Sequence, residues 1–586
     1  MHDTSIPQIP ASKQIVIERL DVEIRSLTER LCLLKSERNS LSNTYTLPPE
    51  ILAEIFTIVQ EECGYSNSEP RRGMFVQCTW LSMTCVSRHW RQVAIECPQL
   101  WCDIRVGTLP PPTIQMFLAR SGGRNLYVSV DPAPRRQAGR QWIEYADLFA
   151  QTSRIERLNV SLEKKTFFRT LSRVFFAQVP NLRSFSISGS GDIVVSDDIF
   201  QATVPHLHSL SLYQCQFTVN SPLLTSNLTT LIVSYCRMGS TTLWLNVLQR
   251  MPRLEYLSLT SSFLGDTYVP ISKDFGIVTL LRLSTLVIQG FIFDSDLDFL
   301  SHLTFPCQTA VVFSSTARSL PLAHDAPPLA AFLQVHRNAC RVDDTPQTNI
   351  TTLNLKFEGS WEELDHPEWA SNMIQFGAGT DGSQQNYLRF NITTTGQNPE
   401  LWKDVPMAEI TLLPVTLATS FTTNFEIKQD NWEILSDRCP HLQEIEVSGM
   451  AVRPLLLALG AGDINSIDPN EEWRALDTYF GGMEGVTSSV GRPEDDAIDF
   501  THDVNDTAAV RESHRLFPSL KSIRMFHIAL HQHKEDIINA LSVRRIKGLP
   551  IERVQLNNWV RDDEFLFDLK GLVQVVDYTS QSHGWD

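Results

Sequence analysis

The sequence of 586 residues predicts a mixed α/β protein: a coiled-coil-like helix and a small helical module at the N-terminus, then a curved α/β solenoid with insertions. Three patterns predict this class. Apolar residues follow heptad spacing between residues 17 and 34, and helix-type apolar spacing fills two segments between residues 47 and 101. From residue 150 onward, a short leucine pattern returns at intervals of 21 to 29 residues, which is typical of a repeat architecture.

Composition and charge narrow the class of protein. The chain is 42% apolar and 20% charged, as expected for a folded protein, and its net charge of -17 argues against a nucleic-acid or anionic-membrane surface. No apolar run approaches the roughly 18 residues that span a bilayer, and no signal peptide is visible. The eleven scattered cysteines suit a reducing compartment. We therefore expect a cytoplasmic or nuclear protein without nucleic-acid or membrane partners.

The first segment predicts an unstructured stretch over residues 1–14 and a coiled-coil-like helix over residues 15–42. Its apolar residues alternate in steps of three and four, and they are Ile17, Leu20, Ile24, Leu27, Leu31 and Leu34. About three heptads lie near the lower limit for a stable two-stranded coil. Two interpretations stay open: self-association of two chains through residues 17–34, or a single helix that packs on its own domain.

The second segment predicts short helices on either side of a gap. Pro48 and Pro49 fix φ for a helix start, and Glu50 suits the N-terminal end of the helix dipole. Helical spacing then joins Ile51, Leu52, Ile55, Phe56 and Val59, and later Leu81, Cys85, Val86, Trp90, Val93 and Ala94. Helices this short have little volume in which to bury large tryptophans, so we expect a partner surface here.

These residues resemble an F-box, in the form common among fungal proteins. The letters L-P-x-E-I-L begin at Leu47, V-S-R-x-W-R spans residues 86–91, and P-x-L-W ends at Trp101. The fungal form continues as LWxxIxV over residues 100–106 and LxRSG over residues 118–122. Residues 61–78 depart from the family and read as an inserted loop. The match covers about 55 residues of the chain, and an ordinary helical cap is the alternative interpretation.

The resemblance implies an F-box over residues 43–106 that docks on the Skp subunit of a cullin-RING ubiquitin ligase. The residues that would make this contact are Leu47, Pro48, Ile51, Leu52, Ile55, Phe56, Val86 and Trp90.

The remainder, residues 107–586, predicts a solenoid of strand–turn–helix units with the template L-x-x-L-x-L. Copies begin at residues 155, 182, 207, 228, 254 and 283, and more widely spaced copies begin at 350, 442, 520 and 551. One unit cannot bury its apolar face alone, so neighbouring units must stack with their strands in a parallel sheet. The pattern resembles the irregular leucine-rich repeats often found behind an F-box. Between residues 460 and 512 an acidic insertion predicts a flexible loop, either solubilising or attractive to a basic partner.

Residues between the template leucines should face the exposed side of the sheet, because side chains alternate along a strand. In early copies these residues are mostly small and hydroxylic, whereas later copies carry charge or bulk. The candidate contacts for a protein substrate are therefore Tyr213, Tyr256, Glu444, Glu446, Arg524 and Phe526. No nucleophile elbow, phosphate loop or metal-ligand spacing is present, so the sequence predicts no enzyme, no cofactor and no metal site.

The sequence therefore predicts a substrate-recruiting adaptor of a Skp/cullin/F-box ligase, with an unknown protein substrate. The alternative is a protein-binding repeat scaffold outside any ligase, in which the F-box-like helices are only an N-terminal cap.

Overall fold

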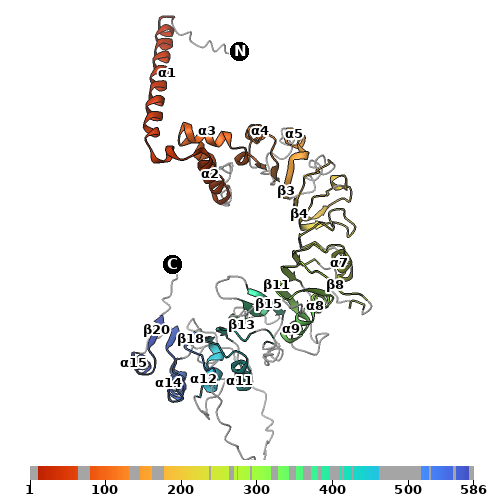
Figure 1. Cartoon of the computed structure of the whole chain (residues 1–586), viewed down its shortest axis with the longest axis vertical. Helices are drawn as coiled ribbons and strands as arrows, with labels where there is room; N and C mark the ends of the chain where they lie inside the picture. The colour runs from red at the N-terminus through yellow and green to blue at the C-terminus, as the bar shows by residue number, and fades with distance from the viewer. Residues whose placement is uncertain are drawn as a thin grey trace, which may run out of the picture. The chain divides into compact units, whose positions relative to one another are not determined.

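The computed structural model describes most of the chain outside its longest loops. The described residues are 11–63, 79–107, 109–130, 146–161, 177–202, 204–236, 239–262, 270–272, 275–290, 293–317, 328–341, 352–359, 371–379, 386–395, 410, 413, 415–424, 427–460, 516–526, 530–557 and 563–579. The chain forms two compact units, Met1–Leu228 and Thr229–Asp586 (Figure 1). The predicted acidic insertion lies outside the described residues, apart from its first residue.

The first unit begins with helices. They are α1 (Ala11–Ser40), η1 (Asn43–Thr46), α2 (Pro49–Cys63), η2 (Thr79–Cys85), α3 (Arg88–Glu96) and η3 (Pro98–Trp101). Two predicted boundaries are wrong. Residues 11–14 belong to α1 rather than to an unstructured stretch, and residues 61–63 continue α2 rather than open a loop. Residues 64–78 lie outside the described part.

The rest of the first unit is a parallel sheet with short helices between its strands. The elements are β1 (Asp103–Val106), α4 (Pro111–Arg120), β2 (Leu126–Val130), α5 (Ala146–Phe149), η5 (Thr152–Arg154), β3 (Ile155–Ser161), β4 (Ser184–Val194), η6 (Ile199–Ala202) and β5 (Ser209–Gln216). Strands β1 to β5 pair in chain order, with Leu158, Phe185 and Leu210 in register. Strand β1 lies at the end of the predicted segment 43–106, and because it pairs with β2 it belongs to the sheet.

The second unit continues the alternation of strand and helix. Its first half contains β6 (Thr230–Ser234), α7 (Thr241–Leu248), β7 (Tyr256–Thr260), β8 (Val278–Thr279), β9 (Thr285–Gln289), α8 (Phe293–Ser301), β10 (Leu303–Pro306), β11 (Ala310–Ala317), α9 (Pro328–Ala339) and β12 (Cys340–Arg341). Strands β6, β7, β9 and β11 pair in parallel, and β8, β10 and β12 form a separate small parallel sheet.

The second half begins with three longer strands, β13 (Thr352–Gly359), β14 (Ser371–Gly379) and β15 (Asn386–Thr395). Strand β14 runs antiparallel to both of the others, and β15 pairs in parallel with β11. Insertions in repeat arrays usually form loops on one face. Residues 371–379 and 386–395 differ from this rule, because β14 and β15 lie within the sheet between β11 and β13.

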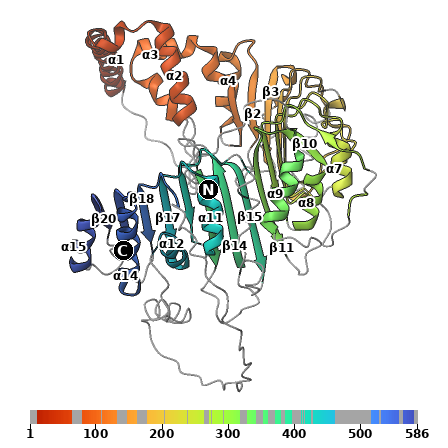
Figure 2. The ribbon, with the colours of Figure 1, turned by 60° about the horizontal axis from the view of Figure 1, so that its bottom comes forward.

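The chain then returns to regular alternation. The elements are β16 (Ser420–Thr423), α11 (Gln429–Arg438), β17 (Glu444–Ser448), η8 (Gly449–Ala451), α12 (Val452–Ala458), β18 (Ser522–Phe526), α14 (Leu530–Ile546), β19 (Arg553–Asn557), α15 (Asp563–Leu572) and β20 (Val575–Thr579). Strands β16 to β20 pair in parallel in chain order. Figure 2 shows α11, α12, α14 and α15 in a row along these strands. The mixed α/β class with a long parallel sheet agrees with the predicted solenoid-like fold.

Gly290, which follows β9, is required by a buried carboxylate. The side chain of Asp296 on α8 is 1% exposed and accepts a hydrogen bond from the Ser315 hydroxyl. A Cβ atom at residue 290 would lie 1.9 Å from Oδ2 of Asp296. The carboxylate is enclosed and hydrogen-bonded, so it has little freedom to move away.

We expect Gly290→Ala to lower the free energy of unfolding by about 1–3 kcal/mol, because the new methyl group must displace Asp296. Gly123→Ala is the matched control, since a Cβ there meets nothing within 4 Å. Urea denaturation measures both variants. Equal stability of the two would contradict this account of Gly290.

His336 on α9 is a buried imidazole between aromatic rings. Its side chain is 4% exposed, and its ring centroid lies 6.0 Å from those of Phe305 and Phe332. Burial lowers the pKa of His336 from 6.5 to about 4, because charging the ring there removes it from water.

Stability should therefore fall as the pH drops from about 6.5 to about 4, since in that window the unfolded chain binds a proton that the folded chain does not. The loss should reach up to about 3 kcal/mol. We expect His336→Phe to flatten this part of the stability–pH profile, whereas the exposed His206→Phe should leave it unchanged. Thermal unfolding measured across this pH range tests both expectations.

Candidate docking surfaces

The helical module has an aromatic core that is closed from within the first unit. Trp80 and Trp101 are both fully buried, with ring centroids 5.1 Å apart. Phe117 of α4 packs edge-on against Trp101 at 5.1 Å, and the Trp101 Nε1–H donates to the Ala94 carbonyl over 2.8 Å. The expectation that the short helices would leave their tryptophans uncovered is wrong for these two side chains. Helix α4 supplies the missing cover.

The inward face of α2 contains two residues that were predicted as direct docking contacts. Leu52 and Phe56 are both 0% exposed, and the Phe56 ring lies 5.3 Å from the half-buried ring of Trp90. The prediction is corrected for Leu52 and Phe56: they belong to the core of the module. Their effect on a partner would be indirect, through the position of α2.

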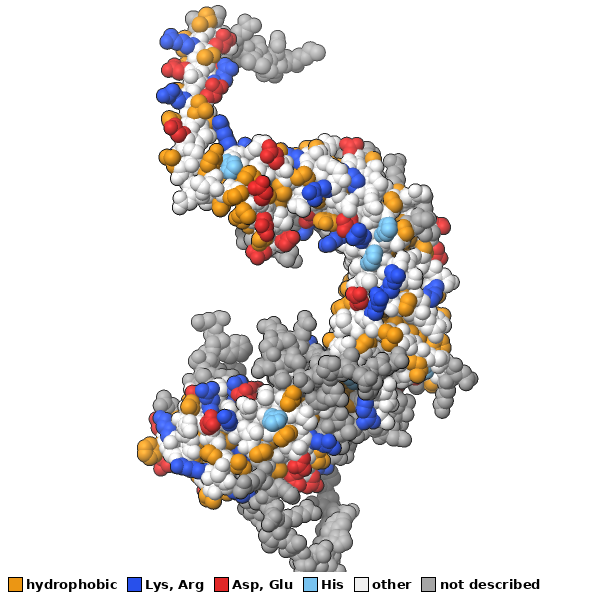
Figure 3. Space-filling model, in the orientation of Figure 1, with side chains coloured by type: hydrophobic (Ala, Val, Ile, Leu, Met, Phe, Trp, Pro, Cys, Tyr) orange, Lys and Arg blue, Asp and Glu red, His pale blue; other side chains and the backbone are white. Residues whose placement is uncertain are grey.

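The outward face of α2 is apolar as well. Ile51, Ile55 and Ile58 are 43%, 38% and 48% exposed, and their spacing of four and three residues places them along one side of the helix. Figure 3 shows hydrophobic side chains on this part of the molecule, interspersed with acidic ones. Ile58 was not among the predicted contacts, although its place three residues after Ile55 was a signal that could have identified it.

Three further predicted contacts lie around the ends of these helices. Val86 is 56% exposed, directly before the start of α3. Ser87 caps that helix, because its hydroxyl accepts a hydrogen bond from the Trp90 backbone N–H over 3.1 Å. Pro48 is exposed and Leu47 is half-buried. The exposed predicted contacts are therefore Pro48, Ile51, Ile55 and Val86.

A second candidate surface lies on the polar side of β17 and β18. Arg524 faces both predicted glutamates: its Nε lies 2.6 Å from Glu444 Oε1, and its Nη1 lies 3.7 Å from Glu446 Oε2. The three side chains are 29–38% exposed. Phe526 lies on the same face, next to Ser448 in the register. The structure thus brings together four residues that are up to 82 positions apart in the sequence (526 − 444).

The same polar face continues over β19 and β20. Gln555 lies beside Arg524 in the register, and Asp577 lies beside Gln555. Arg553 reaches Asp577 across the two strands, at 3.9 Å from its Nε to Oδ2. The leucine template did not identify Asp577, because at β20 its leucine positions are occupied by Val573, Val576 and Tyr578 instead.

The remaining predicted substrate contacts, Tyr213 and Tyr256, lie in different units, on β5 and β7. Tyr213 is 39% exposed and pairs in the register with Ser188, whereas Tyr256 is half-buried between Thr230 and Thr285. Each lies on the polar side of its strand.

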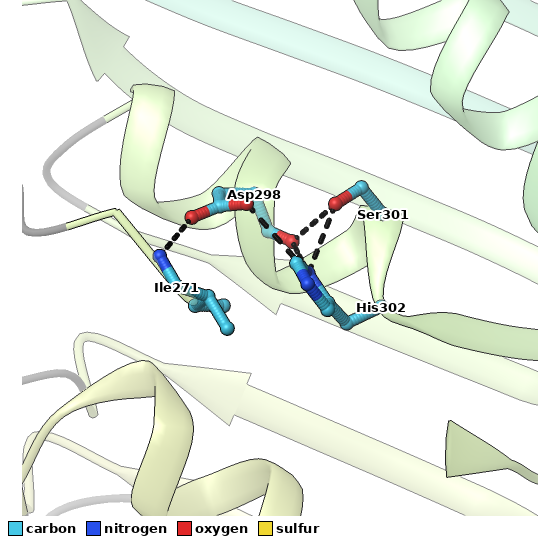
Figure 4. A network of polar contacts seen from close by, with 4 residues as sticks. All are labelled: Ile271, Asp298, Ser301 and His302. Carbon is cyan, nitrogen blue, oxygen red and sulfur yellow. Dashed lines mark hydrogen bonds and ion pairs between the residues drawn. The ribbon is translucent and has the colours of Figure 1, made fainter. Parts of the chain in front are cut away.

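One cluster has the residue types of a hydrolase triad (Figure 4). Asp298, Ser301 and His302 lie at the end of α8, and Asp298 Oδ2 accepts a hydrogen bond of 2.7 Å from the Ile271 backbone N–H. Both Ser301 Oγ, at 3.1 Å, and Asp298 Oδ1, at 3.6 Å, face the same ring nitrogen of His302, Nδ1. In a triad the serine and the carboxylate meet opposite nitrogens. The cluster therefore ties a loop to the helix end.

Within the described residues, no group of three or more His, Cys, Asp or Glu side chains is placed to hold a metal ion. No helix in the described ranges has both the length and the apolar character needed to cross a membrane.

Comparison with known proteins identifies no family for this chain. No family model matches the chain, and no curated protein matches it. Among solved structures, the chain is similar to InlP of Listeria monocytogenes, with 12% sequence identity and a TM-score of 0.21, over 51% of this chain and 90% of that one. A similarity of this degree carries no argument about fold or function.

The ion pairs of Arg524 lead to a prediction for the second surface. Arg524→Glu would place three carboxylates side by side, and we expect it to lower the free energy of unfolding by about 1 kcal/mol at neutral pH, since these groups are partly exposed. The loss should shrink near pH 4, because fewer carboxyl groups are charged there and their mutual repulsion is weaker.

Arg553→Glu is the matched control for this variant. Arg553 and Asp577 are 56% and 53% exposed, so reversal of this charge should change stability by less than about 0.5 kcal/mol. Urea titrations at both pH values measure the effect. A loss that is equal for the two variants would contradict a special role for Arg524.

Proposed function

We propose that this chain is a substrate-recruiting adaptor of a Skp/cullin/F-box ubiquitin ligase, and that the exposed face of its helical module docks on the Skp subunit. The observation that carries the proposal is the row of Ile51, Ile55 and Ile58 on α2, open to water above a closed core. Burial of apolar surface contributes about 25 cal/mol per Å². An apolar helix face of this kind suits a groove on a partner.

The module supports docking by holding α2 in place. Leu52 and Phe56 anchor its inner side, and the pair of Trp80 and Trp101 fills the space beneath the other helices. A helix fixed in this way presents its outer isoleucines with little loss of backbone freedom on binding, and such pre-organisation favours affinity. Val86 adds an exposed apolar residue at the start of α3.

In this proposal the polar faces of the sheets hold the protein substrate. The face over β17 to β20 combines Glu444, Glu446, Arg524, Phe526 and Asp577, which offer charge and an aromatic anchor. An adaptor of this class makes and breaks no bonds. It raises the effective concentration of substrate lysines near the ligase's conjugating enzyme.

A repeat scaffold outside any ligase is the second candidate function, and one observation favours it. Phe117 of α4 closes the core of the helical module by contact with Trp101 and Trp80, whose ring centroids lie 5.1 Å and 6.0 Å away. Helix α4 directly follows the first strand of the sheet. Helix α4 thus joins the helical module to the sheet, as a helical cap on the end of a repeat array requires.

The deciding experiment measures binding of purified full-length chain to purified Skp subunit. We expect the double variant Ile51→Asp with Ile55→Asp to weaken binding at least about tenfold, because two exposed apolar contacts are replaced by charges. The variant should fold, since neither side chain is in the core. A substitution at Phe56 would test the fold instead of the surface.

The matched control is Ile277→Asp with Leu281→Asp, which changes two aliphatic side chains that are 65% and 53% exposed in the second unit. It should bind the Skp subunit as the wild type does. Circular dichroism verifies that both variants are folded. No measurable binding by the wild type, with the chain folded, would favour the scaffold and sink the ligase proposal.

A further inference from the structure

Helix α1 exposes a continuous apolar seam. The helix spans 30 residues, and its heptad residues Ile17, Leu20, Ile24, Leu27, Leu31 and Leu34 are 40%, 51%, 59%, 63%, 51% and 53% exposed. Single exposed apolar side chains are ordinary, but six of them in heptad spacing form one stripe along the helix. At 1.5 Å per residue the stripe is about 27 Å long. Such a stripe is stable in water when a second helix covers it.

We infer that a second copy of this chain covers the seam, with the two α1 helices antiparallel. The seam itself is compatible with either direction, because isoleucine and leucine fill its layers in both. The charged residues that flank the seam decide between the directions. The inference does not rest on the proposed ligase function.

A parallel pair sets like charges against each other. In a parallel pair, a charged residue that directly precedes a seam residue faces the residue of the second helix whose number is five higher. Arg30 then faces Lys35 of the second copy, and symmetry repeats the contact on the other side. Glu23 faces Thr28 and gains no ion pair. Like-charge pairs at such positions are destabilising.

An antiparallel pair sets opposite charges together. When Ile24 of one helix packs beside Leu27 of the other, Ile17 meets Leu34 and Leu20 meets Leu31 in the same register. All six seam residues are then covered. In this register Glu23 faces Arg30 of the second copy, and symmetry again repeats the contact. Asp21 faces Thr28, without repulsion.

The charged residues at the two ends of the seam favour neither the parallel nor the antiparallel direction. Lys13 and Arg38 occupy the next heptad positions on either side. In the antiparallel pair Lys13 faces Arg38 of the second copy. In the parallel pair each of the two residues faces its own equivalent. Either direction therefore brings two like-charge layers together at the helix ends. The flanking pairs attract in the antiparallel pair and repel in the parallel pair, so they favour the antiparallel dimer.

Charge reversal at Arg30 tests both the dimer and its direction. Sedimentation equilibrium of the full-length chain over a concentration series measures the dissociation constant. In the antiparallel dimer Arg30→Glu sets two glutamate pairs together, and we expect dimerisation to weaken about tenfold or more. In a parallel dimer the same change would place the new carboxylate opposite Lys35 in two symmetric contacts and strengthen dimerisation, which would overturn the proposed direction.

The double variant Glu23→Arg with Arg30→Glu restores opposite charges in the antiparallel register and should dimerise within about threefold of the wild type. Glu29→Arg is the matched control, since residue 29 lies on the side of the helix away from the seam. It should leave the dissociation constant unchanged. Leu27→Asp should abolish the dimer.

The inference would also be overturned by a monomeric wild type at every concentration, by a dimer that Leu27→Asp leaves intact, or by a double variant as weak as Arg30→Glu alone. The Ile51→Asp, Ile55→Asp variant should dimerise like the wild type. Failure of the ligase proposal and failure of this one are therefore separable.

Discussion

The in-register stacking of apolar side chains between neighbouring parallel strands is the constraint on which the rest of the structure depends. In the second unit Phe421, Ile445, Ile523 and Val554 lie side by side on four successive strands, each 0–1% exposed. A buried aliphatic side chain contributes about 1.5–3 kcal/mol, but only if both neighbouring strands are present. The inward residues are therefore mostly apolar, and the exceptions are small hydroxylic residues such as Thr423, which lies beside Val447 and is 1% exposed. The outward residues are free to vary.

The leucine spacing was sufficient to locate most of these strands. Six early copies of the template and four later ones fall at strands or directly before them. Apolar residues at every second position, in a pattern that returns every 20–30 residues, are typical of the strands of a repeat array. Strands β14 and β15 escaped prediction. They are held by alternating residues such as Phe376, Ala378 and Leu388, and β14 runs in the opposite direction, so neither fits a template of parallel repeats.

The exposed apolar face of the helical module could be predicted only in part. Apolar residues occupy positions 51, 52, 55, 56, 58 and 59 of α2, so the helix has two apolar sides and the spacing does not say which one is inside. The aromatic partners decide it. Trp90 packs on Phe56, and α4 closes the remaining core from a segment outside the motif. Leu52 and Phe56 thus turn inward, and the β-branched side chains at 51, 55 and 58 are left in water.

Self-association through α1 would change what the exposed surfaces can do together. A partner that binds one polar sheet face with modest affinity gains little binding free energy from that contact alone. The ion pairs within the face of β17 and β18 already satisfy much of the charge of that face. Two chains joined by α1 present that face twice. A substrate with two copies of its recognised segment then binds its second site at a high effective concentration, with no new contact needed. If both proposals hold, this partly neutralised surface and the heptad seam are compatible parts of one binding strategy, in which selectivity comes from valency as much as from any single contact.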